Sequence, residues 1–234
     1  MPFSSRAKTY TEAFLRLFYP AYCGICRSFL EVQEHGLCGA CAASLQPLQR
    51  QLDTACLSME FEHVDNAWSL YPYRSPVKEL LRAVKFQRRR WLLKPALSRL
   101  DDLLSPILSE THYDAIVPVP IDRERLLERE FNQAELLANF IGRTCGVPVR
   151  SHFLKKHSSI PAQSLLRPEE RLTNPIGAFR ATASRKIRGK NLLLVDDIVT
   201  TGATADEAAR QLKQAGARRI DLLTLACSTV SERN

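Results

Sequence analysis

The segment NLLLVDDIVTTGAT, residues 191–204, constrains the fold more than any other part of this chain. Its first five residues carry no charge, which is typical of a strand buried on both faces of a parallel sheet. Asp196 and Asp197 follow directly, and a turn rich in threonine and glycine leads into a segment with helical periodicity. We expect the strand to end at Val195 and the helix to begin near Thr204, which has capping-box spacing to Glu207.

The alternation of strands and helices extends beyond this segment. Apolar runs predict further strands at 113–118 and 218–227, and helical patterning predicts a helix within 131–146 that starts after Asn132 and ends near Gly146. Such alternation favours an α/β fold, with a parallel sheet flanked by helices. Residues 42–70 are weakly patterned, and we interpret them as a connector.

The turn at residues 200–204 has the composition of a phosphate-binding loop. Its hydroxyls and N–H groups would sit at a helix N-terminus, and Gly202 permits close approach. Asp196 and Asp197 would repel a bare phosphate, so they favour a ligand that also offers hydroxyls or brings a divalent cation. A sugar phosphate meets both conditions, and an ordinary acidic strand end is the alternative. The chain lacks the glycine-rich loops of P-loop and dinucleotide-binding proteins.

Four cysteines near the N-terminus form two C-x-x-C pairs separated by eleven residues. Two such pairs can complete a tetrahedral metal shell, and four filled positions indicate a structural site. We expect zinc, with an iron–sulfur cluster or a redox pair as alternatives. The predicted ligands are Cys23, Cys26, Cys38 and Cys41.

Residues 74–99 carry nine basic residues and one acidic residue, within a chain of net charge +8. An apolar stripe predicts a helix here, formed by Val77, Leu80, Leu81, Val84 and Phe86. The basic side chains are either a solvated helix face or a surface for phosphate or nucleic acid, with Tyr73 and Trp91 available for stacking.

We expect a cytoplasmic protein without membrane insertion. No uncharged apolar run approaches the roughly 18 residues of a membrane span. Charged residues interrupt the first 19 residues, which therefore lack a secretory pattern.

The stretch LLLVDDIVTTGAT, residues 192–204, resembles the phosphoribosyl-pyrophosphate signature of type I phosphoribosyltransferases. The chain as a whole resembles the ComF/GntX family, which is tied to DNA uptake in natural transformation and to use of imported DNA. The family usually reads R-G-F-N-Q where this chain has REFNQ, so Glu130 replaces a glycine. Besides the cysteines, the resemblance rests on VKFQ at 84–87, VPVP at 117–120, RLLEREFNQAELLA at 125–138 and PAQSLLRPEERLTNPIGAF at 161–179.

The resemblance implies roles for individual residues. Asp196 and Asp197 would bind the ribose hydroxyls and stabilise positive charge on the sugar, as the catalytic residues. The 5′-phosphate would be held by Thr200, Thr201, Gly202, Ala203 and Thr204. The pyrophosphate, bridged to the ribose by Mg²⁺, would lie at Pro118, Val119 and Pro120. Residues 155–176 would form a flexible lid with Lys155, Lys156, Gln163 and Arg171, and Arg129 and Lys85 could neutralise further phosphate charge.

The expected organisation has three parts. Residues 1–60 would form an N-terminal helix and a small zinc-ribbon-like domain, 61–110 a basic connecting or cap segment, and 111–234 a type I phosphoribosyltransferase-like domain. The expected function is binding of phosphoribosyl pyrophosphate, with transfer to an unidentified acceptor, in DNA uptake or use of imported DNA. The alternative is a non-catalytic module that handles single-stranded DNA alongside uptake or helicase machinery and uses the pocket for ligand binding only.

Overall fold

The computed structural model of the chain describes residues 14–16, 18–48, 60–87, 89–97, 104, 108, 111–157 and 177–228. The chain divides into two compact units. The cysteine unit comprises residues 1–46 and 74–99, and the sheet unit comprises 47–73 and 100–234.

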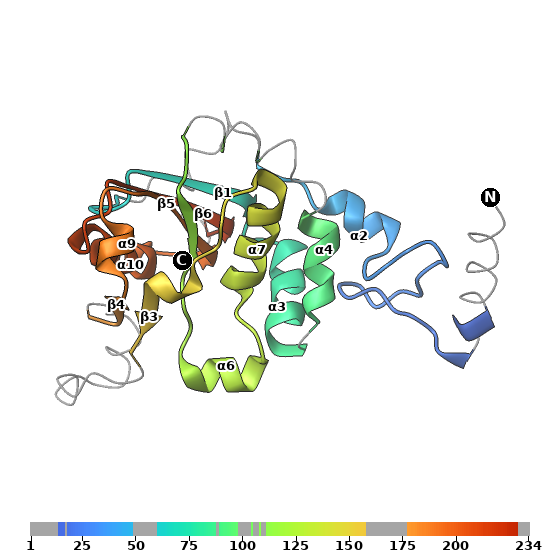
Figure 1. The fold of residues 1–234 in the computed structure, drawn as a ribbon. Helices are drawn as coiled ribbons and strands as arrows, with labels where there is room; N and C mark the ends of the chain where they lie inside the picture. The colour runs from blue at the N-terminus through green and yellow to red at the C-terminus, as the bar shows by residue number, and fades with distance from the viewer. Residues whose placement is uncertain are drawn as a thin grey trace, which may run out of the picture. The chain divides into compact units, whose positions relative to one another are not determined.

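The sheet unit is built on four parallel strands in the order β1-β6-β5-β2. Figure 1 labels three of them, β1, β5 and β6. Their bounds are β1 Asn66–Pro72, β2 Ala115–Pro118, β5 Asn191–Val199 and β6 Arg219–Cys227. Eight consecutive residues of β6, from Ile220 to Cys227, are buried in the centre of the sheet, as expected for a strand covered on both faces. The prediction of a parallel α/β sheet is therefore confirmed.

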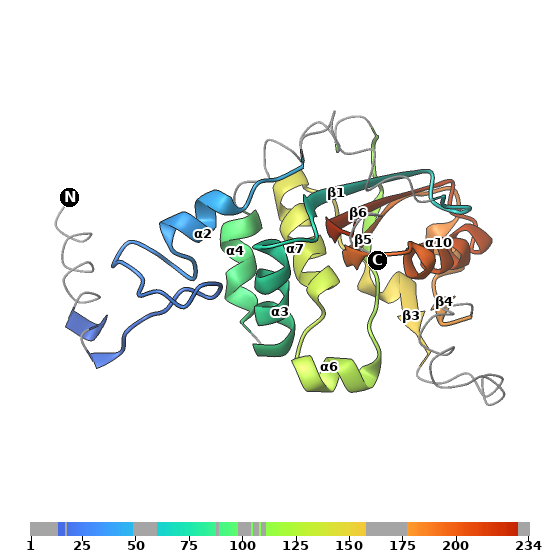
Figure 2. The same ribbon diagram turned by 180° about the vertical axis from the view of Figure 1, so that it is seen from behind.

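Strand β1 begins within residues 42–70, which the sequence analysis interprets as a connector, and ends two residues beyond them. It forms the edge of the sheet beside β6 (Figure 2), with Asn66 opposite Asp221 and Pro72 opposite Cys227. Its sequence, NAWSLYP, mixes polar and apolar residues because an edge strand is only partly covered. The pattern was therefore too weak to predict it.

Two long helices pack on the sheet. α7, Gln133–Cys145, contacts β2 and β5, and α10, Ala203–Gln214, contacts β5 and β6. Because alternate residues of a strand face opposite sides, Ile116 lies towards Gly142 of α7, whereas Val117 belongs to the apolar cluster that includes α10. The flanking helices therefore cover both faces.

The predicted helix boundaries are confirmed at α7 and partly wrong at α10. Asn132 caps α7 by accepting a hydrogen bond from the Ala134 N–H, and Gly146 ends it in a left-handed conformation. β5 does not end at Val195 but continues to Val199, because its outer half pairs with β6. The N-cap of α10 is Gly202, without a side-chain cap, so Thr204 is already helical and forms no capping box.

A second, two-stranded sheet is formed by β3, Leu154–Lys156, and β4, Phe179–Ala181, which are antiparallel. It is followed by α9, Ser184–Ile187. The two strands bring the ends of the predicted lid together, since Lys156 pairs with Phe179. Residues 158–176 of that segment, including Gln163 and Arg171, lie outside the described residues.

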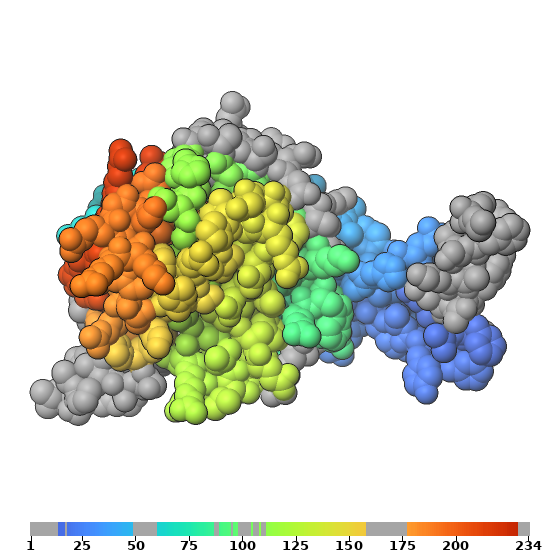
Figure 3. Space-filling model, viewed as in Figure 1, coloured from blue at the N-terminus to red at the C-terminus, as the bar shows by residue number. Residues whose placement is uncertain are grey.

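The sheet unit also contains α6, Arg123–Arg129, which follows β2. Residues 123–128 are all exposed, and they belong to the surface seen in Figure 3. Arg129, the last residue of α6, is buried instead.

The cysteine unit contains α2, Gly39–Ser44, α3, Val77–Gln87, the 3-10 turn η1, Arg90–Leu92, and α4, Leu93–Leu97. The predicted helix of the basic segment is confirmed by α3, where Val77, Leu80, Leu81 and Val84 are buried. Phe86 was predicted in this stripe but is 67% exposed, because it lies away from the buried side of the helix. Among the described residues, no helix has the length and apolarity to cross a membrane.

Candidate functional site

The candidate site lies where β2 ends beside the middle of β5. Pro118 is opposite Val195, and the Val119 N–H donates to the Val195 carbonyl at 2.8 Å. The turn formed by Pro118, Val119 and Pro120 therefore starts directly beside Asp196. Parallel strands place their carboxyl ends at one edge of the sheet, which is where α/β proteins bind ligands.

Asn132 fixes the position of this turn. Its Nδ2 donates to the Val119 carbonyl at 2.9 Å, while its Oδ1 accepts the Ala134 N–H at 3.1 Å. One buried side chain therefore joins the turn to the start of α7. The neighbouring Gln133 is 2% exposed, and neither polar atom of its side chain has a hydrogen-bond partner.

The two aspartates of β5 lie next to this turn and are half-buried. The Asp196 carboxylate accepts the Asp197 N–H at 2.8 Å, and the Asp197 carboxylate accepts the Ile198 N–H at 2.8 Å. Burial, together with the charge of Asp197, raises the pKa of Asp196 well above its ordinary value, although Lys156 opposes this. A pair of crowded carboxylates favours a ligand that brings donors or positive charge.

Two cations interact with the pair. The charge of Lys156 on β3 attracts the Asp196 carboxylate electrostatically, and Lys156 Nζ lies 3.1 Å from Asp122 Oδ2. Arg129 is 8% exposed, and its Nε has no hydrogen-bond partner. Burial, helped by Arg125, lowers the pKa of Arg129, whereas attraction to Asp197 opposes the shift. The site therefore contains both carboxylates and cations, which suit a ligand with hydroxyl and phosphate groups.

Glu130 adopts the conformation for which glycine is suited. Its φ is 68° and its ψ is −4°, and its N–H closes α6 on the Leu126 carbonyl at 2.8 Å. A left-handed conformation costs a residue with a side chain about 1–2 kcal/mol. The chain thus keeps the left-handed turn with glutamate at this position, and the turn directly follows Arg129.

The loop from Thr200 to Thr204 connects β5 to the first turn of α10. Thr200, Thr201 and Thr204 are exposed, and Gly202 has a φ of 82°. Gly202 is also covered by Phe61: a Cβ at this glycine would lie 2.7 Å from the Phe61 ring. Two reasons, conformation and space, therefore require glycine here.

The segment around Phe61 was missed at the level of sequence. His63 donates its backbone N–H to Asp206 Oδ1 at 2.8 Å, and its Nδ1 lies 3.0 Å from Asp206 Oδ2. It thereby attaches residues 61–63 to the first turn of α10, from 143 positions away in the chain. No local pattern could have revealed a contact at that separation.

The sequence also predicted ligand contacts for two further lysines. Lys155 is exposed on β3, and its side chain alternates to the face opposite that of Lys156. Lys85 belongs to the cysteine unit, on α3.

The four predicted metal ligands converge within the cysteine unit. Each of Cys23, Cys26, Cys38 and Cys41 offers a sulfur, and all four sulfurs lie within 4.8 Å of one another. The Cys26 and Cys38 sulfurs are 3.6 Å apart, close to the roughly 3.8 Å edge of a tetrahedron around a zinc ion with 2.3 Å bonds.

The donor set also has the chemistry of a metal site. Contact with the Ser28 hydroxyl and N–H lowers the pKa of Cys26 to about 6, which favours a thiolate. Burial and the neighbouring sulfurs raise the pKa of Cys41, and a bound cation would relieve that crowding. Gly24 lies beside the cluster, and a Cβ there would come within 2.5 Å of Leu92. The cluster is thus suited to one metal ion.

Comparison with known proteins identifies relatives of this chain. Residues 132–233 match the phosphoribosyl transferase domain family. Competence protein F of Haemophilus influenzae is 31% identical over 159 residues, 66% of this chain and 69% of that protein. DNA utilization protein YhgH of Escherichia coli K12 is 32% identical over 164 residues, 68% of this chain and 70% of that protein.

The chain belongs to the ComF family. Its sheet unit has the phosphoribosyltransferase fold, and the matched region of this ComF protein includes both aspartates and the loop before α10. A solved adenine phosphoribosyltransferase is also similar, at 17% identity and a TM-score of 0.39, covering 63% of this chain and 76% of that one.

Proposed function

We propose that this ComF protein binds phosphoribosyl pyrophosphate with Mg²⁺ at the carboxyl ends of β2 and β5, and that it acts in DNA uptake or use of imported DNA. The observation that carries the proposal is the placement of Asp196 and Asp197 between the Pro118–Pro120 turn and the loop at 200–204. The proposed cellular role follows the names of the relatives, a competence protein and a DNA utilization protein.

Each part of the ligand has matching chemistry. In the proposal, the loop Thr200–Thr204 holds the 5′-phosphate through hydroxyls and backbone N–H groups at the N-terminus of α10. Asp196 and Asp197 accept hydrogen bonds from the ribose hydroxyls. Lys156 and Arg129 neutralise pyrophosphate beside the Pro118–Pro120 turn, with Mg²⁺ supplying charge compensation between pyrophosphate and ribose. A bound pyrophosphate would also give the buried Arg129 guanidinium the partner that its Nε lacks.

If the protein turns the ligand over, the bond between ribose C1 and pyrophosphate breaks and a bond from C1 to an acceptor forms. The two carboxylates then stabilise positive charge on the ribose, and pyrophosphate leaves with the bonding electrons. The closely paired β3 and β4 would anchor a lid that keeps water from the reactive sugar. The proposal leaves the acceptor open.

Calorimetric titration with phosphoribosyl pyrophosphate, with and without Mg²⁺, tests the binding proposal. We expect micromolar, Mg²⁺-dependent binding by the wild type and none by the Asp196→Asn/Asp197→Asn variant. Asp114→Asn is the matched control, since it removes a carboxylate at the opposite end of the sheet, where Asp114 pairs with Lys190 at 2.7 Å. Absence of binding by folded wild-type protein would refute the proposal.

We propose further that the ion of the cysteine cluster is a structural Zn²⁺. Four thiolates fill a tetrahedral shell and leave no open position for substrate. We propose a cytoplasmic location, where these four cysteines would remain reduced and able to hold the ion. Metal analysis of purified protein should give one zinc per chain, whereas iron with inorganic sulfide would contradict the assignment.

Single-stranded DNA binding is a second candidate function, favoured by one observation in the cysteine unit. Trp91 is 59% exposed, and the basic residues Arg90 and Lys94 beside it are exposed as well. An exposed aromatic ring among cations can stack on a base while the cations contact phosphates.

Two variants test this candidate. Trp91→Ala should weaken binding of an oligonucleotide about tenfold, in line with the value of a stacked base. Charge reversal at Arg89 and Arg90 should weaken binding and flatten its salt dependence. Charge reversal at Arg185, an exposed residue of the sheet unit, is the control. Equal affinity for the oligonucleotide in the wild type and all three variants would exclude the surface around Trp91 as a DNA-binding site.

A further inference from the structure

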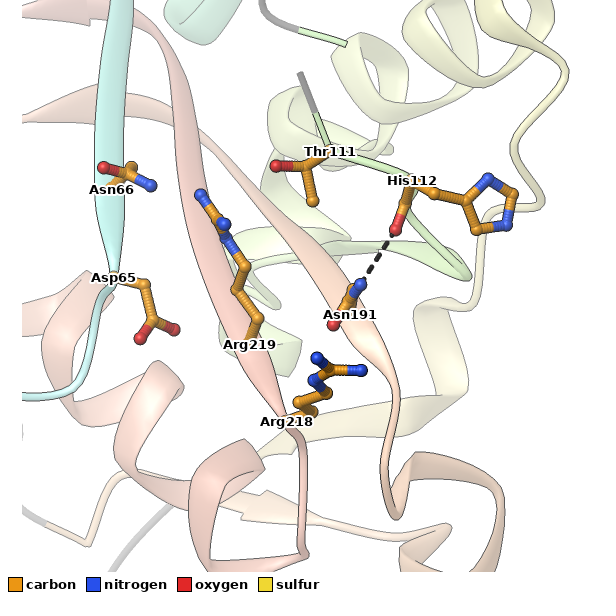
Figure 4. A pocket seen from close by; sticks show the side chains of 7 residues that line it. All are labelled: Asp65, Asn66, Thr111, His112, Asn191, Arg218 and Arg219. Carbon is orange, nitrogen blue, oxygen red and sulfur yellow. Dashed lines mark hydrogen bonds between the residues drawn. The ribbon is translucent and has the colours of Figure 1, made fainter. Parts of the chain in front are cut away.

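A polar pocket lies at the end of the sheet opposite the aspartate site. It has a volume of about 500 Å³ and opens where strands begin: Asn66, Asn191 and Arg219 are the first residues of β1, β5 and β6 (Figure 4). Asn191 and Asp196 are five residues apart on β5, about 16 Å along the strand. This amino-end pocket is therefore separate from the site with the aspartates.

Two consecutive arginines give the amino-end pocket its charge. Arg219 directs its terminal nitrogens between Asn66 and Thr111 in Figure 4, while its Nε donates to Asp221 at 2.8 Å. Asp221 is fully buried and also accepts the Tyr113 hydroxyl at 2.6 Å. The Arg219 guanidinium is thus held by a fixed carboxylate, with its outer edge towards the pocket.

Arg218 is exposed and contributes a second guanidinium to the lining. The acidic residue of the lining, Asp65, is already engaged, since it accepts Lys213 Nζ at 2.6 Å and the Ile220 N–H at 2.7 Å. Burial alone would raise the pKa of Asp65, but these two donors lower it, so it remains ionised. The pocket and its ion-pair partners contain three cations, those of Arg218, Arg219 and Lys213, and two carboxylates, those of Asp65 and Asp221. The excess positive charge favours an anion.

One hydrogen-bond acceptor atom in the lining also lacks a donor. Asn191 Nδ2 donates to the His112 carbonyl at 3.0 Å, but Asn191 Oδ1 is buried without a hydrogen-bond partner (Figure 4). A buried acceptor without a donor is unfavourable, and a ligand that brings an O–H or N–H would satisfy it. The ligand therefore needs a donor group as well as an anionic group.

We propose that the amino-end pocket binds a small organic phosphate of nucleotide size. Its phosphate is held by the forked guanidiniums of Arg218 and Arg219, which suit a phosphate geometrically. A hydroxyl or amine of the same molecule donates to Asn191. The volume lies within the range of small-molecule pockets, roughly 300–1,000 Å³, and exceeds what a bare phosphate fills. This inference does not rest on the proposed function of the other site.

The test is a titration followed by two-dimensional ¹⁵N–¹H NMR, with deoxyadenosine monophosphate, inorganic phosphate and deoxyadenosine as separate probes. The nucleotide should shift the side-chain amide signals of Asn66 and Asn191, and should bind at least tenfold more tightly than either other probe. The Asp196→Asn/Asp197→Asn variant should give the same shifts, because it changes only the other end of the sheet.

Two variants and one control locate the binding. Arg218→Ala, which removes no hydrogen bond described within the protein, should weaken nucleotide binding about tenfold. Asn191→Ala should reduce the preference for nucleotide over inorganic phosphate. Arg143→Ala removes the same charge from an exposed position on α7 and should change nothing. Unchanged affinity in Arg218→Ala, or shifts confined to the aspartate site, would overturn the proposal. Equal affinity for the nucleotide and inorganic phosphate would overturn the proposal that the ligand is of nucleotide size.

Discussion

Replacing Gly202 by alanine tests how the loop before α10 is built. Two costs are expected. The φ of 82° costs an alanine about 1–2 kcal/mol, and the new Cβ would lie 2.7 Å from the Phe61 ring, an overpacking that costs about 1–3 kcal/mol. Since alanine also restricts the unfolded chain by roughly 0.4–1 kcal/mol, the net loss should be about 1–4.5 kcal/mol.

Two further proteins separate these costs in urea unfolding. Gly146→Ala is the conformational control, because Gly146 has a similar φ of 72° but nothing within 4 Å of its Cβ position. It should lose only about 0.5–1.5 kcal/mol. In the Phe61→Ala background, Gly202→Ala should lose about the same small amount, because the clash is gone. The double-mutant cycle should thus show a coupling of about 1–3 kcal/mol.

The two glycine variants should also differ in their binding of phosphoribosyl pyrophosphate. If the loop at 200–204 holds the 5′-phosphate, Gly202→Ala should weaken binding of phosphoribosyl pyrophosphate at least tenfold, and Gly146→Ala should leave it unchanged. A Gly202→Ala protein as stable as the Gly146→Ala protein would refute the role of Phe61 as a constraint on this loop. A coupling energy of zero in the cycle would refute it equally.

Three further predictions concern single positions. The raised pKa of Asp196 means that its ionised form lowers stability; the cost is absent below the ordinary pKa of 3.8 and grows as the pH rises through the raised value. Asp196→Asn should therefore unfold at a higher urea concentration than wild type at pH 8 and at the same urea concentration near pH 3.5; a stability difference independent of pH would contradict this. Glu130→Gly should raise the free energy of unfolding by about 0.5–1 kcal/mol, because glycine removes the left-handed strain at φ 68°; an unchanged or lower value would show that the side chain compensates for it. Cys38→Ser should release the metal and destabilise the cysteine unit while binding at the aspartate site persists, with Cys145→Ser as the control; retained metal would contradict the four-cysteine assignment.

The main elements of the sheet unit could be predicted because their signals are local. An uncharged run such as Leu192–Val195 must be buried on both sides, and Asn132 and Gly146 mark helix ends through their own hydrogen bonds and conformation. Two C-x-x-C pairs similarly indicate a shared metal because each pair forms one tight turn. Spacing alone was sufficient for these features.

Features that depend on contacts between distant segments could not be predicted. The edge strand β1 is stabilised by pairing with β6, and β5 passes Val195 because β6 continues beside it. The predicted cap at Thr204 failed because Gly202 already turns the chain, while Glu207 is occupied by Arg210 and the Gly177 N–H.

The sequence by itself determined the fold class, the grouping of the four cysteines and the acidic pair that lies on β5, because each is specified by neighbouring residues. Only the tertiary structure decided what surrounds them: Phe61 over Gly202, Arg129 buried near Asp197, and the arginines of the amino-end pocket beside Asn191. These arrangements join residues from separate segments of the chain. Their energies come from burial and charge, which depend on the folded surroundings and not on spacing along the sequence.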